Sequence, residues 1–217
     1  MGYLDQQPWT WEIRVVDDGS TDATREIVAG LRAREPRIVL QAEPHRGKGG
    51  AVRAGLLAAT ARFRFMCDAD LSMPVHEIRR FLPPVLDGVD LAIATREGAG
   101  ARRVGEPLSR HLAGRLFNTF VRLLVVPGIH DTQCGFKMFT AEAISAIFPH
   151  ATVDGWAFDI EALLIARRRG LRIREVPIEW HYRPDSQVRI LHDGISMARD
   201  VLRIRRLARQ GLYDSRG

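Results

Sequence analysis

Cysteine, lysine and long apolar runs are scarce in this chain of 217 residues, and each shortage excludes a class of protein. Cys67 and Cys134 are the only cysteines and form neither a CxxC pair nor a Cys/His pattern, which favours a reduced, cytosolic protein over a disulfide scaffold. No stretch approaches about 18 consecutive apolar residues, so no transmembrane helix is expected. The first residues lack the basic and then apolar segments of a secretory signal. None of the seven histidines lies at metal-ligand spacing from another, so a zinc site is not expected.

The positive charge comes almost entirely from arginine, because only two of the 32 basic residues are lysines. The net charge is +6, and arginine favours bidentate contacts with phosphate. Nucleic acid, an anionic membrane surface or a phosphorylated substrate would each suit this charge. A basic nucleic-acid-binding module needs aromatic residues interleaved on a basic face. Here aromatics are 7% of the chain and lie in apolar runs, so this alternative is the less favoured one.

Strand-like and helix-like segments alternate along the first 96 residues. The patterns predict strands at 12–17, 37–42, 63–68 and 89–96, and helices at 21–34, 48–62 and 75–86. Such alternation is typical of an α/β fold with a mostly parallel central sheet flanked by helices. A Gly/Arg-rich loop at 97–107 is then followed by predicted helices at 108–126, 141–148, 157–169 and 193–210, and strands at 135–139 and 172–181. No linker divides the chain, so residues 1–217 are expected to form one domain.

Paired carboxylates follow two of the predicted strands. Asp17 and Asp18 follow the first strand, and Asp68 and Asp70 follow the third. In open parallel sheets, ligands bind beyond the carboxyl ends of the strands. Asp18 alone could be a turn former or a helix cap. Two acids one residue apart can share Mg²⁺ or Mn²⁺ and leave positions open for phosphates, so Asp68 and Asp70 predict a metal site beside a nucleotide diphosphate.

The segment 45–50, His-Arg-Gly-Lys-Gly-Gly, is the second feature that indicates an anion site. Glycines before a helix expose backbone N–H groups, and Lys48 adds a cation. Neither the GxxxxGK[ST] nor the GxGxxG pattern is present, so this segment is not a nucleotide-binding loop of those two types. A flexible turn is the alternative interpretation.

Five motifs in series carry a resemblance to a known family: VVDDGSTD at 15–22, RGKGGAVRAG at 46–55, CDADLSMP at 67–74, DTQCGFKMF at 131–139 and DGWAFDIEAL at 154–163. The chain resembles the family 2 inverting glycosyltransferases with the GT-A fold over residues 9 to 185. Among these it is most similar to the dolichyl-phosphate β-glucosyltransferase branch. The resemblance implies metal-dependent, inverting transfer of a hexose, with glucose favoured, from a nucleotide-diphosphate sugar to a polyprenyl or dolichyl phosphate. UDP-glucose is the favoured donor and GDP-mannose a possible one.

The resemblance also implies roles for individual residues. Those expected to hold the nucleotide sugar are Asp17, Asp18, Ser20, Lys48 and Asp68, with Asp68 and Asp70 as ligands of Mg²⁺ or Mn²⁺. Arg96 and Arg110 match positions for the acceptor phosphate, and Asp131 and Asp159 lie near the reacting centre. A lipid phosphomonoester is mostly dianionic at pH 7 and needs no general base. Asp131 is therefore expected to position its neighbours rather than to act as an obligatory base.

Other functions remain open at this point. A glycosyltransferase of the same fold could act on a sugar acceptor. A sugar-phosphate nucleotidyltransferase would also use metal-binding acids, but it would carry an N-terminal glycine-rich signature ending in Arg and Pro, which this chain lacks.

The last predicted helix, within 190–212, is amphipathic. Its apolar arc contains Met197, Val201, Ile204, Leu207 and Ala208, and its other side carries Arg199, Arg203, Arg205, Arg206 and Arg209. Such a helix can lie in the interface of an anionic membrane, which would make the protein peripheral at the inner, cytoplasmic face. The equally favoured alternative is that this helix closes the core of the domain.

One part of the family pattern is missing. The family begins with an apolar strand, a turn similar to PxYNE and a helix, and this chain has neither the strand nor the turn. The strand is normally central, so its absence should leave unpaired backbone groups and an uncovered edge. We expect either a start site assigned too far downstream or an inactive, truncated copy, with the former favoured because every later motif is intact.

Overall fold

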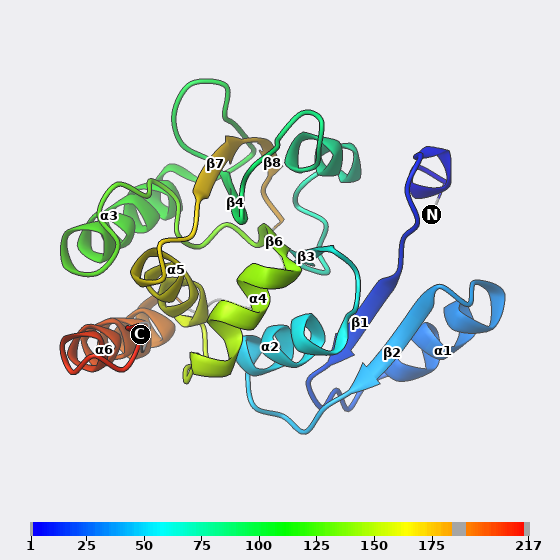
Figure 1. The fold of residues 1–217 in the computed structure, drawn as a ribbon, viewed down its shortest axis with the longest axis horizontal. Helices are drawn as coiled ribbons and strands as arrows, with labels where there is room; N and C mark the ends of the chain where they lie inside the picture. The colour runs from blue at the N-terminus through cyan, green and yellow to red at the C-terminus, as the bar shows by residue number, and fades with distance from the viewer. Residues whose placement is uncertain (1, 184–189, 215–217) are drawn as a thin grey trace.

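A computed structural model describes residues 2–183 and 190–214, as an α/β arrangement with three sheets (Figure 1). The first sheet pairs β1 (Ile13–Asp17) with β2 (Ile38–Ala42), in parallel. The second has the order β3 (Phe63–Cys67), β6 (Phe136–Thr140), β4 (Leu91–Thr95) and β7 (Ile173–Pro177). The third pairs β5 (Arg102–Val104) with β8 (Glu179–His181). The helices are α1 (Thr24–Arg34), α2 (Lys48–Ala58), α3 (Leu108–Leu124), α4 (Ala141–Ile147), α5 (Phe158–Arg168) and α6 (Ile190–Arg209), with 3₁₀ turns at Leu4–Gln6, Val75–Phe81 and Phe148–His150.

The four-stranded sheet is mixed, which corrects the expectation of a mostly parallel sheet. Strand β6 is antiparallel to both β3 and β4, whereas β4 and β7 are parallel. Between β4 and β6 the chain makes a loop, β5 and α3 and then returns to the end of the sheet that it left, so β6 runs back along β4. Strands β1 and β2, which α1 connects, do run parallel, as the sequence predicted.

The sheet edges of β1 and β3 both lack a strand partner on one side. Among the described strands, β1 pairs only with β2, and β3 only with β6. Helix α2 packs against both β1 and β3. It approaches β1 closely at Gly55, where an added Cβ would lie 2.6 Å from Cγ2 of Val16. Strands β1 and β3 therefore each have one edge without a partner among the described strands, and the uncovered edge expected from the missing strand stays a prediction.

Helix α6 closes the core of the domain, so the predicted membrane-interface role of its apolar arc is wrong. Val201 and Ile204 are fully buried, and Ala208 nearly so, in the cluster that also contains the apolar side of α5, and Met197 is buried as well. The hydroxyl of Tyr213 fixes the end of this segment by donating a hydrogen bond of 2.6 Å to the buried carboxylate of Glu161. A covered apolar face cannot also lie in a bilayer.

Several predicted boundaries change in the structure. The predicted helix at 75–86 is a shorter 3₁₀ turn at Val75–Phe81, and Pro83 and Pro84 prevent it from continuing to residue 86. Helix α1 begins at Thr24 rather than at residue 21, and Asp22 accepts the hydrogen bond from its first N–H, at 3.0 Å. Residues 184 and 185, the end of the family-like stretch, lie outside the described residues. Within the described ranges, no helix combines the length and apolar character needed to cross a bilayer.

Candidate active site

The strand directions bring four of the predicted site residues, Asp68, Asp70, Arg96 and Asp131, to one edge of the four-stranded sheet. Strands β3 and β4 both run antiparallel to β6, and β7 runs parallel to β4, so all three end where β6 begins. The segments that meet there are 68–72, 96–97, 130–135 and 179–182. Two backbone hydrogen bonds join them: the N–H of Asp68 donates to the carbonyl of Gly135 at 3.1 Å, and that of His181 donates to Ser72 at 2.8 Å.

Asp17, at the end of β1, is buried, and both of its carboxylate oxygens accept hydrogen bonds. It accepts hydrogen bonds from the backbone N–H of Ser20 at 3.1 Å and from Nε of Arg25 at 2.5 Å. The side chain of Ser20, followed by that of Arg25 and by the Ser20 N–H, lowers the pKa of Asp17 to about 2. Asp17 therefore fixes the 17–20 turn, and contact of Asp17 and Ser20 with the nucleotide stays a prediction.

Asp18 occupies the backbone donors that the sequence assigned to a phosphate. Its carboxylate accepts the N–H groups of Arg46 and Gly47, each at 2.9 Å, and lies 2.9 Å from Nδ1 of His45. Asp18 thus occupies the N–H groups of residues 46 and 47, and an anion site at Lys48 stays a prediction. Its glycines allow close approach: an added Cβ at Gly47, which has φ +114°, would lie 2.7 Å from the carbonyl oxygen of Asp154.

Lys48 faces the predicted metal site. Its Nζ lies 2.7 Å from Oδ1 of Asp68, at the start of α2. Burial alone would lower the pKa of Lys48, but the carboxylates of Asp68, Asp159 and Asp70 outweigh it, and the pKa is raised. The structure therefore places an ammonium group on one of the two carboxylates expected to bind a cation.

Asp68 and Asp70 project from one tight turn after β3. Asp70 is exposed, and its Oδ1 accepts a hydrogen bond of 2.9 Å from the N–H of Ser72. Leu71, which lies between Asp70 and Ser72, has a positive φ of 48°. No group of three His, Cys, Asp or Glu side chains able to hold a metal occurs in the part of the chain that the structure describes. Two hard oxygen donors with open surroundings suit Mg²⁺ or Mn²⁺ when a substrate supplies the remaining ligands.

A buried ion pair that the sequence analysis missed lies beneath this turn. Nζ of Lys137, in β6, is 2.8 Å from Oδ1 of Asp159 in α5 and donates a hydrogen bond of 2.6 Å to the carbonyl of Cys134. Both side chains are buried, and burial raises the pKa of Asp159 despite the two nearby lysines. The signal in the sequence was a lone charge in the apolar strand FKMF. Asp159 is therefore a buried carboxylate that interacts with the charges of Lys137 and Lys48.

Arg96 and Asp131, predicted separately, form one bidentate pair. The Nε and one terminal nitrogen of Arg96 lie 2.7 and 2.9 Å from the two oxygens of Asp131, and the N–H of Arg96 donates to the same carboxylate at 3.0 Å. Asp131 is fully buried, which would raise its pKa, but the charge and hydrogen bonds of Arg96 hold the pKa at about 2. Asp131 is thus an ionised anchor for Arg96.

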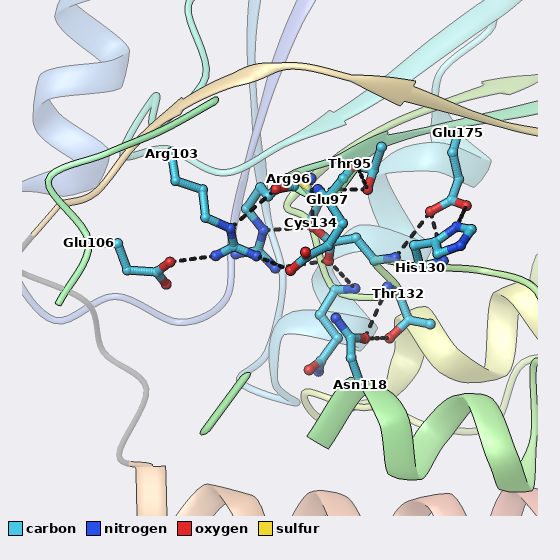
Figure 2. A network of polar contacts seen from close by, with 12 residues as sticks. Thr95, Arg96, Glu97, Arg103, Glu106, Asn118, His130, Thr132, Cys134 and Glu175 are labelled. Carbon is cyan, nitrogen blue, oxygen red and sulfur yellow. Dashed lines mark hydrogen bonds and ion pairs between the residues drawn. The ribbon is translucent and has the colours of Figure 1, made fainter. Parts of the chain in front are cut away.

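Figure 2 shows the polar network around this pair. Arg103 donates to the carbonyl of Arg96 and to the carboxylates of Glu97 and Glu106. From the other side, Glu175 in β7 accepts the N–H groups of residues 130 and 131, at 2.9 and 3.1 Å. Asn118 in α3 binds the N–H and hydroxyl groups of Thr132. Side chains from β7 and α3, together with Arg96 after β4, therefore hold the 130–132 segment in place.

Two neighbouring aromatic side chains after β7, Trp180 and Tyr182, each contact one of the arginines predicted to bind the acceptor. The guanidinium carbon of Arg96 lies 5.3 Å from the ring centroid of Trp180, and that of Arg110 lies 5.3 Å from the ring of Tyr182. The two ring centroids are 6.2 Å apart. The sequence analysis did not select Trp180 or Tyr182, because nothing in the local pattern places them beside arginines distant in sequence.

Cys134 links the two halves of the site. It is buried, and its pKa is raised to about 12 by burial and then by the charge of Asp131, with a further contribution from Asp68. The charges of Asp131, Arg96 and Asp68 therefore all act on the same buried thiol.

Comparison with solved structures gives the class of the fold. The chain superposes on mannosyl-3-phosphoglycerate synthase from Rubrobacter xylanophilus with a TM-score of 0.69 and 22% identity, covering 97% of this chain and 67% of that one. It also matches glucosyl-3-phosphoglycerate synthase from Mycobacterium tuberculosis, crystallised with Mn²⁺, uridine diphosphate and phosphoglyceric acid, with a TM-score of 0.63 and 20% identity, covering 94% and 69%. The fold is therefore that of the GT-A glycosyltransferases, as predicted.

The sequence comparisons give the family. The profile described as Glycosyl transferase family 2 matches residues 3–148, and the chain belongs to that family. It is 37% identical over 212 residues to "Dolichyl-phosphate beta-glucosyltransferase ALG5C" of Trichomonas vaginalis, covering 94% of this chain and 63% of that protein. It is 32% identical over 222 residues to the dolichyl-phosphate beta-glucosyltransferase of Saccharomyces cerevisiae, covering 94% and 66%. The chain thus spans somewhat less than two thirds of the length of these relatives.

Proposed function

We propose that this chain carries out metal-dependent, inverting transfer of a hexose from a nucleotide-diphosphate sugar to a polyprenyl phosphate. Glucose is the favoured hexose and dolichyl phosphate the favoured acceptor, since the relatives at 32–37% identity bear the name dolichyl-phosphate beta-glucosyltransferase. UDP-glucose is the favoured donor, because a structural neighbour was crystallised with Mn²⁺ and UDP-glucose. The observation that carries the proposal is the pairing of Arg96 with Asp131 at the sheet edge where Asp68 also lies.

The donor side of the reaction depends on the turn after β3. Asp68 and Asp70 would hold Mg²⁺ or Mn²⁺, which, when bound, neutralises the charge that develops on the departing nucleotide diphosphate. Lys48, whose Nζ lies 2.7 Å from Asp68, would add a fixed positive charge beside the nucleotide diphosphate. Asp159, held by Lys137, keeps a negative charge beneath Lys48.

The acceptor side depends on two arginines. A lipid phosphomonoester is mostly dianionic at neutral pH, so it attacks the anomeric carbon without a general base. Arg96 and Arg110 would orient this phosphate, and the planar guanidinium suits that task. A carboxylate with a pKa of about 2 is a poor base at neutral pH, which favours the positioning role for Asp131. In-line attack then inverts the anomeric centre and gives a β-linked sugar.

A transfer assay with single variants tests these two halves separately. The 217-residue chain is incubated with Mn²⁺, radiolabelled UDP-glucose and a polyprenyl phosphate, and label in the lipid phase is counted. We expect Asp70→Asn to abolish transfer and Arg96→Ala chiefly to raise KM for the lipid. Arg102→Ala removes a mainly exposed arginine of β5 and serves as the matched control. Unchanged turnover in Asp70→Asn would refute the metal assignment.

The second candidate is transfer to the hydroxyl group of a sugar. Such an acceptor requires a base near its hydroxyl, because an alcohol is a poor nucleophile at neutral pH. Label that stays in the water-soluble fraction with a sugar acceptor, and does not enter the lipid phase, would support this candidate instead. With a lipid acceptor, we propose that the protein works at the cytoplasmic face of a membrane, as a peripheral protein.

A further inference from the structure

Helix α3 exposes a row of leucines that nothing in the described part of the chain covers. Leu108, Leu112, Leu116 and Leu123 expose 79%, 65%, 75% and 80% of their surface. At 100° per residue these positions fall within an arc of about 80° on one side of the helix. The opposite side contains Asn118 and Val121, which are buried against the domain. We call these four residues the leucine stripe.

The charge beside the leucine stripe has one sign. Helix α3 contains three arginines and a histidine and no acidic residue. Arg115, which is exposed, and Arg122 lie along one border of the stripe, within about 40° of Leu108 on the helical wheel. An apolar row bordered by cations is the arrangement of helices that lie in the interface of an anionic membrane.

We propose that the leucine stripe docks the protein on an anionic lipid surface. Two copies of the chain facing each other across this stripe would bring arginines of the same charge together, which disfavours a dimer through this face. Helix α6 cannot take this role, because Val201 and Ile204 on its apolar side are buried. Arg110, in the first turn of α3 beside Tyr182, lies on the side of α3 opposite the stripe, toward the candidate site.

This inference extends the proposed function, since it supplies the surface from which a lipid phosphate would reach Arg96 and Arg110. Membrane binding needs neither donor nor acceptor, so it is measured in the absence of both. Failure of docking is therefore distinguishable from failure of sugar transfer, which is measured with a detergent-dispersed polyprenyl phosphate.

The test is flotation of the 217-residue chain with vesicles of equal parts phosphatidylcholine and phosphatidylserine. The variant Leu112→Glu/Leu116→Glu places two carboxylates in the stripe. The matched control is Ile27→Glu/Leu31→Glu, which changes an exposed apolar pair with the same spacing on α1. Helices α1 and α3 lie at opposite ends of the molecule in Figure 1. Both variants alter the net charge equally, and circular dichroism checks that each is folded.

We expect the stripe variant to lower the partition coefficient more than about tenfold while the control changes it little, because two leucines lose burial in the lipid. Arg115→Gln/Arg122→Gln should weaken binding to these vesicles by roughly 20-fold and leave binding to pure phosphatidylcholine vesicles unchanged. Equal binding of the stripe variant and its control would overturn the proposal. So would a wild-type dimer in sedimentation that the stripe variant converts to monomer, because the stripe would then bind a second copy.

Discussion

Lys48 and Asp68 form an ion pair across the gap between the start of α2 and the end of β3, with Nζ 2.7 Å from Oδ1. Lys48 and Lys137 are the only lysines in the chain, and each is paired with a carboxylate of the candidate site. The ammonium of Lys48 therefore lies where a divalent cation would meet Asp68. Under the proposed metal assignment, a divalent cation at Asp68 would compete with this ion pair for the same oxygen.

Replacing Lys48 should tighten metal binding while impairing the use of the donor. With Lys48→Met, Asp68 has no internal cation, so the affinity for Mn²⁺ without nucleotide is expected to rise about tenfold, equivalent to roughly 1.4 kcal/mol. Electron paramagnetic resonance of free Mn²⁺ gives the Kd directly. Arg102→Met removes a distant charge and should leave the Kd unchanged. A weaker or unaltered Mn²⁺ affinity in Lys48→Met would contradict the competition.

Adding a methyl group at Gly135 should disturb Asp68. A Cβ at this position would overlap the carboxylate of Asp68, so Gly135→Ala forces the side chain away from its present place. We expect Mn²⁺ affinity to fall at least about tenfold with only a small change in Tm, since the damage is local. Isothermal titration with Mn²⁺ and thermal unfolding measure the two effects.

Gly114→Ala is the matched control for that substitution. Gly114 lies inside α3, and no atom is within 4 Å of an added Cβ. It should leave Mn²⁺ binding unaltered and stabilise the fold by up to about 1 kcal/mol, because alanine favours the helix. If both alanine variants affected Mn²⁺ binding equally, Gly135 would have no special relation to Asp68.

The Arg96–Asp131 pair should be strongly coupled in stability. Removing the carboxylate in Asp131→Asn leaves a largely buried guanidinium without its counter-ion, which is expected to cost about 3 kcal/mol in the free energy of unfolding. The double variant Arg96→Met/Asp131→Asn should cost much less than the sum of the single changes. Urea unfolding of the four proteins measures this cycle. Additive effects would show that the two side chains do not depend on each other.

Acid should remove this contribution within a defined pH window. The pKa of Asp131 is about 2 in the folded protein and 3.8 without its neighbours. Because the folded value is the lower one, the stabilisation is fully present above pH 3.8 and is lost as the pH falls toward 2. The free energy of unfolding of the wild type should therefore fall more steeply over this range than that of Asp131→Asn. Parallel curves would contradict the assignment.

The sequence predicts the site residues that directly follow a strand, because their positions depend only on neighbouring residues. Asp68 and Asp70 follow a strand within three residues, so the pattern of a strand and a turn was sufficient to place them. Arg96 follows β4 in the same way. The general position of α6 was also clear from its periodicity. What the pattern left undecided was whether the apolar arc faces a membrane or the core, because both surfaces select the same residues.

Relations between distant segments could not be predicted in this way. The direction of β6 depends on the path of the chain through α3, and it decides that residues 130–135 meet the turn after β3. The donors of loop 45–47 looked free because nothing in the sequence indicates that Asp18 accepts them. Lys137 and Trp180 acquire their partners only through the sheet.

The anomeric configuration of the lipid product is the most direct test of the proposed reaction. The chain is incubated with UDP-glucose, Mn²⁺ and polyprenyl phosphate, and the product is examined by the proton coupling at its anomeric carbon. Our account predicts a polyprenyl phosphate that carries β-linked glucose, and predicts that the Asp70→Asn variant does not form it. An α-linked product, or a lipid product formed equally well by Asp70→Asn, would contradict it.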